Sequence, residues 1–119
     1  MNATRFLPLN PREFLVLLSL VDEEQYGYGI VRTVEEQSEG AVLLDPANLY
    51  RILKRLMRDG LVDDVDTREA EETDNERRRY YRLTRLGREV VAAEARRLEG
   101  LTKVARAKKL LAGRQRKLT

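Results

Sequence analysis

The sequence predicts a mainly α-helical domain that carries one small β-hairpin and ends in a long helix. Three observations support this fold class. A helix with marked ends spans Asp45 to Gly60, and the two-residue alternation of β-strands follows it. Thr84 then caps a last helix, whose pattern runs to about Ala112. At 1.5 Å per residue this last helix is about 40 Å long, whereas the domain before it is about 25 Å across. The last helix therefore extends beyond its own domain.

The composition is that of a soluble, folded protein with an uneven distribution of charge. Its 119 residues are 36% charged and 42% hydrophobic, and the formal net charge is +3. Residues 63–76 hold eight acids and one base, a charge of −7, so the rest of the chain carries +10. A strongly basic body with one acidic segment fits a polyanionic partner better than the net charge suggests.

The residue types that are absent exclude several kinds of chemistry. The chain has no Cys and no His, which excludes thiol redox sensing, Cys/His zinc sites and nucleophiles activated by His. Asp63, Asp64 and Asp66 form a candidate carboxylate cluster, although this spacing is also that of a solvated turn. No glycine-rich phosphate loop accompanies the cluster, so the sequence predicts a protein that is not an enzyme and uses no metal or cofactor.

The hydropathy pattern does not predict contact with a membrane. No apolar run approaches the roughly 20 residues of a membrane span, and the first residues lack the apolar segment of a signal peptide. We therefore expect a cytoplasmic protein.

The first part of the chain predicts a short arm and a buried helix. Residues 1–9 form the arm, and Asn10 followed by Pro11 marks a helix start, with Glu13 placed to reach back as in a capping box. The apolar run over residues 14–21 predicts that this helix is buried on most sides.

A second helix is expected over roughly residues 27–38, after a turn at Tyr26-Gly27-Tyr28-Gly29. Its apolar residues are spaced for one buried stripe. We interpret Tyr26 and Tyr28 at its start as packing residues. Residues 41–44 then form a short, extended apolar connection.

The helix from Asp45 to Gly60 has two chemically different faces. Asp45 is suited to cap it, Pro46 fits the first helical position, and Gly60 can adopt the left-handed conformation that ends a helix. The outer face carries Asn48, Arg51, Lys54, Arg55 and Arg58. A solvated face usually mixes both signs of charge, whereas this one is nearly all cationic. Two interpretations stay open: an ordinary solvated face, or a recognition helix in the major groove of DNA.

Two candidate strands follow, over residues 61–65 and 79–83, with a long polar segment between them. Arg77, Arg78 and Arg79 lie where the second strand begins. They can reach phosphate or a narrow minor groove, or they can simply neutralise the acidic segment before them. The order of helix, helix, basic helix, hairpin and long helix is that of a winged helix-turn-helix.

This order divides the chain into four parts. We expect an arm (1–9), a winged helix-turn-helix DNA-binding domain (10–83), a C-terminal dimerisation helix (84–112) and a disordered basic tail (113–119).

The last helix, which extends beyond the domain, has an apolar stripe that must be buried against another surface. A second copy of the same helix is the simplest such surface. The residues expected at that contact are Leu86, Val90, Leu98, Leu101, Val104 and Leu111. The alternative is a lone helix that folds back on its own core. Three charged residues interrupt the stripe, Glu94, Arg97 and Lys108. Two interpretations stay open for them: ion pairs between the subunits, or a looser contact.

Several motifs in this order resemble the PadR family of transcriptional regulators, of the short type with a single C-terminal helix. The matching segments are Tyr26-Gly27-Tyr28-Gly29-Ile30, Asn48-Leu49-Tyr50-Arg51-Ile52-Leu53-Lys54-Arg55-Leu56, Asp59-Gly60-Leu61-Val62, Arg79-Tyr80-Tyr81-Arg82-Leu83-Thr84 and Gly87-Arg88. The resemblance implies a homodimeric winged-helix protein that binds double-stranded DNA, usually as a repressor, and that dimerises through the C-terminal helix. The two-fold geometry of such a dimer predicts a roughly palindromic operator. It also implies that Tyr50 faces the operator, while packing at the helix edge is the alternative for this residue. Whether the protein also binds a small-molecule effector, as yet unidentified, is left open by the resemblance.

The two leading functions differ in whether the protein touches DNA. The first is a sequence-specific regulator of transcription that binds double-stranded DNA. The alternative is a winged-helix protein-interaction module without direct DNA binding, which the acidic segment 63–76 favours. Such a module predicts no shift of duplex DNA at near-physiological salt.

Overall fold

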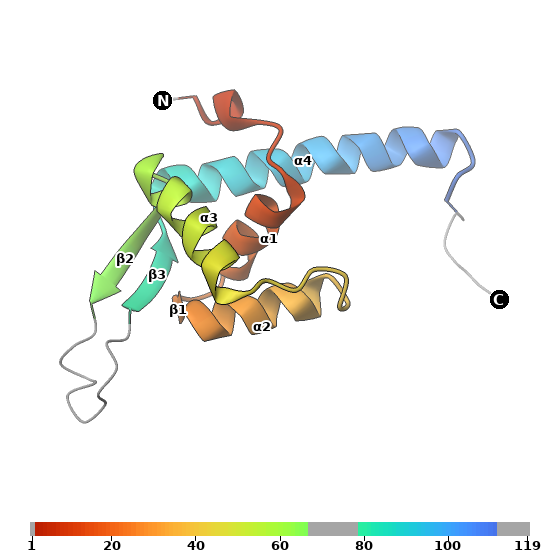
Figure 1. The fold of residues 1–119 in the computed structure, drawn as a ribbon. Coiled ribbons are helices and arrows are strands. Elements are labelled where there is room, and N and C mark those ends of the chain that lie inside the picture. Colours follow the sequence, from red (N-terminus) through yellow and green to blue (C-terminus); the bar gives the residue numbers. More distant parts are fainter. Residues whose placement is uncertain (1, 67–78, 112–119) are drawn as a thin grey trace.

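The computed structural model of the chain describes residues 2–66 and 79–111. A short 3₁₀ helix, η1 (Ala3–Phe6), precedes four α-helices and three short strands. The helices are α1 (Pro11–Ser19), α2 (Gly27–Gln37), α3 (Pro46–Arg58) and α4 (Arg85–Ala107). The strands are β1 (Gln25–Tyr26), β2 (Val62–Asp66) and β3 (Arg79–Leu83). Figure 1 shows the hairpin β2–β3 beside α3 at one end, and α4 extending well beyond the other helices at the other. The predicted fold class is confirmed.

Three helices begin at side-chain caps that the sequence predicts. Asn10, Asp45 and Thr84 each accept a hydrogen bond from the backbone N–H three residues ahead, at 2.8–2.9 Å. Each cap satisfies one of the N–H groups that a helix start leaves without a partner. Gly60 has a φ of +81° and ends α3 as expected. These local signals therefore fix where α1, α3 and α4 start and where α3 stops.

The hairpin gains a third strand that the sequence does not predict. β3 lies between β2 and β1, with antiparallel pairing on both sides. Gln25 and Tyr26 of β1 pair with Tyr81 and Tyr80, and the rings of Tyr26 and Tyr80 lie 5.3 Å apart. Two residues are too few to show a period, so the sequence predicts only a turn here. β3 supplies the pairing that turns this stretch into a strand.

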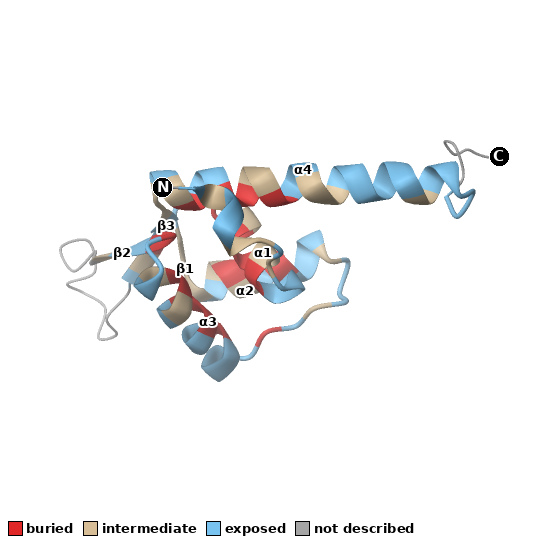
Figure 2. Ribbon diagram, turned by 90° about the horizontal axis from the view of Figure 1, so that it is seen from above, coloured by how far each residue is buried: buried red, intermediate tan, exposed pale blue. Residues whose placement is uncertain are grey.

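One hydrophobic core joins all four helices and the sheet. Its fully buried side chains include Leu17 of α1, Ile30 of α2, Leu53 of α3 and Val90 of α4. Figure 2 shows that the buried residues of α4 lie in its first half, on the side that faces α1. The expected boundary between residues 83 and 84 therefore does not separate two cores, because the first half of α4 packs in the same core as the preceding helices and sheet.

A buried carboxylate connects the N-terminal arm to α4. Glu94 is 1% exposed and accepts a hydrogen bond from the Leu9 backbone N–H at 3.1 Å. Two N–H groups of Arg97 donate to the same carboxylate at 2.6 and 2.8 Å. The hydrogen bonds from Arg97 hold the pKa of Glu94 below its usual value; burial opposes this shift and the Leu9 N–H adds to it. Of the interpretations left open for Glu94, the cross-subunit ion pair is wrong, since its partners Arg97 and Leu9 belong to the same chain.

α4 ends earlier than the sequence predicts. Its last helical residue is Ala107, and Lys109 adopts a left-handed φ of +66°. The Leu110 N–H then bonds back to the Ala105 carbonyl at 3.0 Å, a geometry that terminates helices. The predicted basic tail and most of the acidic segment, residues 67–76, lie outside the described residues. Over the residues that the structure describes, no helix is both long and apolar enough to cross a membrane.

Candidate nucleic-acid interface

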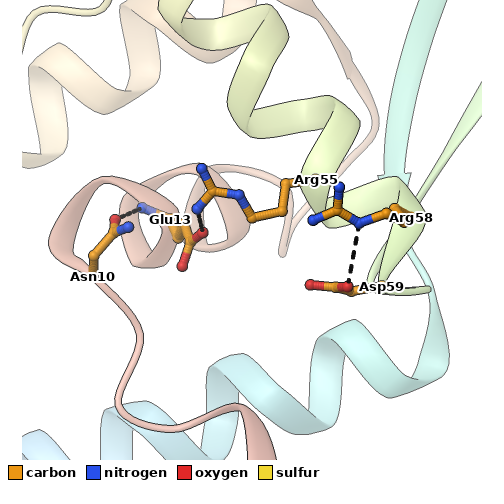
Figure 3. Close-up of polar contacts among 5 residues, drawn as sticks. All are labelled: Asn10, Glu13, Arg55, Arg58 and Asp59. Carbon is orange, nitrogen blue, oxygen red and sulfur yellow. Dashed lines mark hydrogen bonds and ion pairs between the residues drawn. The ribbon is translucent and has the colours of Figure 1, made fainter.

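The outer face of α3 presents three cations to solvent. Arg51, Lys54 and Arg58 are all exposed, while the opposite face of the helix is buried in the core. The Arg58 Nε lies 3.9 Å from the Asp59 carboxylate, and the Arg58 side chain is 73% exposed (Figure 3). An exposed pair at this distance contributes little stability. All three cations are therefore available to a polyanion.

Arg55, the fourth predicted cation, is held by a different element. Its Nη1 donates to the Glu13 Oε2 at 2.6 Å, and Figure 3 shows this side chain reaching from α3 across to α1. The Glu13 side chain is 12% exposed, against 42% for Arg55. The capping-box prediction for the Glu13 carboxylate is wrong, because this carboxylate is turned toward α3 and accepts from the Arg55 guanidinium there. Only the Asn10 half of the predicted cap is present.

The side chain of Asn48 is engaged at both ends. Its Nδ2 donates to the Asp45 Oδ2 at 3.1 Å, and its Oδ1 accepts from the Arg51 Nη2 at 3.2 Å. All three side chains are exposed at the first turns of α3. A bidentate pair with adenine needs both the oxygen and the nitrogen of this amide. Asn48 must therefore break its hydrogen bonds to Asp45 and Arg51 before it can pair with a base.

Two tyrosines near α3 are exposed rather than packed. Tyr50 is 58% exposed, and the Lys54 Nζ lies 5.5 Å from its ring centroid. Tyr28 at the start of α2 is 67% exposed, with the Arg32 guanidinium 5.7 Å from its ring. The interpretation of Tyr28 as a packing residue is therefore wrong. Gly27 and Gly29 flank Tyr28 and have no side chains, so the sequence around Tyr28 does not indicate which way it points. Tyr26 is half-buried in the sheet.

The arginines before the second strand are only partly described. Arg79 forms an ion pair with Asp64 across the hairpin, and its side chain is 54% exposed. This contact is the neutralising role that the sequence leaves open for it. Arg77 and Arg78 lie outside the described residues. Among the described residues, no three acidic side chains gather closely enough to hold a metal ion.

The residues predicted at the dimer contact fall into three groups. Val90 is fully buried in the core of its own chain, so it is not available to a partner. Leu86 and Leu98 are half-buried. The remaining three are exposed, at 53% for Leu101, 51% for Val104 and 42% for Leu111. The free part of the predicted contact therefore lies in the second half of α4 and just beyond its end.

A three-helix core with a cationic third helix, followed by an antiparallel hairpin, defines a winged helix-turn-helix protein. Residues 16–93 match the profile of the transcriptional regulator PadR-like family. The chain belongs to this family, as its motifs suggest.

Relatives share the fold at low sequence identity. A PadR family transcription regulator from Clostridium difficile R20291 is 27% identical, with a TM-score of 0.68 over 80% of this chain and 94% of that one. Bacillus subtilis PadR, solved in complex with operator DNA, is 21% identical, with a TM-score of 0.62 over 72% of this chain and 47% of that one. An uncharacterized protein X of Lysinibacillus sphaericus is 24% identical over 74 residues, which span 62% of this chain and 65% of that protein.

Proposed function

We propose that the chain is a sequence-specific regulator that binds double-stranded DNA as a homodimer and represses transcription. The observation that carries this proposal is the exposed cationic face of α3, formed by Arg51, Lys54 and Arg58 and framed by the hairpin. In a winged helix this is the element that enters the major groove. The Bacillus subtilis relative, whose structure contains operator DNA, supports the same role. Such a regulator acts on DNA in the cytoplasm.

The residues of α3 divide into two roles under this proposal. Arg51, Lys54 and Arg58 contact phosphates or guanine edges, and Asn48 and Tyr50 lie where bases or phosphates are reached. Arg55 instead positions α3, because its guanidinium is already bound to Glu13 of α1. Its loss should weaken binding to all sequences alike without removing a phosphate contact.

The homodimer follows from the exposed stripe at the end of α4. Leu101, Val104 and Leu111 are large apolar side chains that lie in water in the single chain, and Leu98 adjoins them. Burying such a stripe against a second copy is favourable. A two-fold dimer then presents two copies of α3 to half-sites about 34 Å apart on one face of the duplex. Repression follows if such a site overlaps a promoter.

Fluorescence anisotropy with DNA that flanks the protein's own gene tests the proposal. Three cations from each of two chains give six phosphate contacts at most, so log affinity should fall against log salt with a slope of about −5. A scrambled duplex of the same length should bind more weakly. A slope near zero, or no binding at near-physiological salt, would contradict the proposal and favour the protein-interaction module.

A further inference from the structure

Three exposed side chains at the start of α3 are joined in one hydrogen-bonded row. Both oxygens of the Asp45 carboxylate accept from Asn48, Oδ1 from its backbone N–H at 2.8 Å and Oδ2 from its side-chain Nδ2 at 3.1 Å. The Asn48 Oδ1 in turn accepts from the Arg51 Nη2 at 3.2 Å. The three residues follow one another at intervals of three, so they lie along one side of the helix. The row therefore connects the cap of α3 to a guanidinium on its cationic face.

The chemistry at the two ends of the row fixes the orientation of the Asn48 amide. An ionised carboxylate only accepts hydrogen bonds, so the amide group beside Asp45 must be the NH₂. A guanidinium only donates, so the group beside Arg51 must be the oxygen. A flipped amide would bring two acceptors together at one end and two donors together at the other. Asn48 therefore holds Arg51 in one way only.

Arg51 differs from Arg55 and Arg79 in the kind of group that holds it. Arg55 is bound to the carboxylate of Glu13, and Arg79 is bound to that of Asp64, so both guanidinium groups are oriented and neutralised at once. Arg51 is held by a neutral amide, and it makes no ion pair with any residue that the structure describes. It therefore keeps its full charge while its direction is constrained.

The donors that remain on Arg51 match the major-groove edge of guanine. A guanidinium has five N–H donors, and Asn48 engages one of them. Guanine presents two acceptors, N7 and O6, to a bidentate arginine, and residues at the start of a recognition helix are those that reach base edges. Arg51 can therefore bind guanine without leaving Asn48. Asn48, in contrast, cannot pair with adenine unless it gives up both of its side-chain bonds.

We propose that Arg51 contacts a guanine in each half-site of the DNA, and that Asn48 and Asp45 are positioning residues that direct its guanidinium at that base. The inference rests on the proposed DNA-binding function and names the base that one residue of α3 selects. Holding a long side chain in its bound direction before binding lowers the entropy cost of the contact. Asn48 thus contributes to specificity without touching a base.

Selection from a duplex library with a randomised centre, carried out with the full-length protein, tests the proposal. The wild type should enrich one guanine in each of two symmetric half-sites. Replacing that guanine should weaken binding about ten- to a hundredfold, the worth of a bidentate pair, and Arg51→Ala should abolish the preference. Asn48→Ala should reduce discrimination at the same base pair by about three- to tenfold, because the free arginine must be ordered on binding.

A double-mutant cycle separates a positioning residue from a second residue that contacts a base. If Asn48 acts through Arg51, Asn48→Ala should have little further effect in an Arg51→Ala background. Additive effects of the two substitutions would overturn the proposal.

The part played by Asp45 is tested without removing the helix cap. Asp45→Ser keeps a capping oxygen for the Asn48 backbone N–H but lacks the second oxygen that holds the Asn48 amide. This variant should unfold at the wild-type temperature and yet discriminate less well at the guanine. Wild-type discrimination in this variant would overturn the role of Asp45.

Arg55→Ala is the matched control, because this arginine lies on the same helix but is bound to Glu13 of α1. It should weaken binding to every sequence alike and leave the preference for guanine intact. The proposal is overturned if Asn48→Ala relaxes a different base pair, which would make Asn48 a base contact, or if Arg51→Ala keeps the preference for guanine. A wild-type protein that enriches no sequence overturns both this proposal and the proposed sequence-specific function.

Discussion

The two halves of α4 share one apolar stripe but have opposite surroundings. In the first half Gly87, Val90, Val91 and Glu94 are all buried within the chain. Farther along the same stripe, Leu101 is more than half exposed, and Figure 2 shows the second half of the helix almost entirely at the surface. An amphipathic pattern thus identifies a face that is to be buried, but not the molecule that buries it.

This difference assigns separate tasks to the two halves. The first half completes the core of the winged domain and fixes the arm through Glu94. The second half, about 15 Å of helix, has no such neighbours and is the part that we propose a second copy covers. Substitutions in the first half should therefore change the stability of the single chain, while those in the second half should change assembly.

The largest expected effect is that of Gly87→Ala. A Cβ at this position would lie 2.0 Å from the backbone oxygen of Leu61, which already accepts the Thr84 N–H at 3.0 Å. We expect the unfolding free energy to fall by about 3 kcal/mol in urea denaturation, because backbone must move. Gly100→Ala in the second half is the control, since nothing lies within 4 Å of its Cβ. It should stabilise the helix by about 0.5–1 kcal/mol, and equal effects at the two glycines would refute the comparison.

Arg97→Ala should destabilise more than Arg96→Ala. Removing the Arg97 guanidinium leaves the carboxylate of Glu94 buried with only the Leu9 N–H as a partner. An unpaired buried charge is costly, whereas Arg96 is exposed and its loss should change stability very little. Thermal unfolding measures both variants. Matching melting temperatures would show that this ion pair does not hold the arm and α4 together.

The contribution of Glu94 should disappear in acid. Its pKa is lower in the folded chain than in the unfolded one, chiefly through Arg97, so the unfolded chain binds the proton more readily. The stability that it adds is therefore fully present above the ordinary glutamate pKa of about 4.3 and is lost as the pH falls through the folded value. Urea denaturation from neutral pH down to about 3 should show the wild type losing its advantage over Glu94→Gln. Glu99→Gln, an exposed control, should differ little from the wild type at any pH.

The smallest effect on chain stability is expected from a Leu101→Lys, Val104→Lys double substitution. Both side chains are about half exposed in the single chain, so the free energy of unfolding should change by no more than about 0.5 kcal/mol per site. Sedimentation velocity should instead show loss of the dimer, with weaker DNA binding as a consequence. Glu99→Lys, on the opposite side of α4, adds charge without touching the stripe and should leave assembly intact. A double variant that still dimerises would place the dimer contact elsewhere.

Sequence reasoning succeeded for α3 because its signals are local. The cap at Asp45, the stop at Gly60 and the division into apolar and cationic faces depend on residues within four positions of one another. Reasoning of the same kind could not place Arg55, whose partner Glu13 is 42 positions away. It also could not show that Tyr28 faces solvent, because the glycines beside that residue carry no periodic signal.

The sequence by itself determined the order of the elements, three helix caps, the cationic face of α3 and the family to which the chain belongs. The tertiary structure decided which side chains on the faces of α3 and α4 remain available to contact another molecule. It buried Val90, bound Arg55 to α1, added β1 to the sheet and joined Leu9 to Glu94, 85 positions away. The physical reason is the range of the interactions. Helix periodicity and capping act within one or two turns, while the partner of a buried charge or of a strand edge is set by how the elements pack.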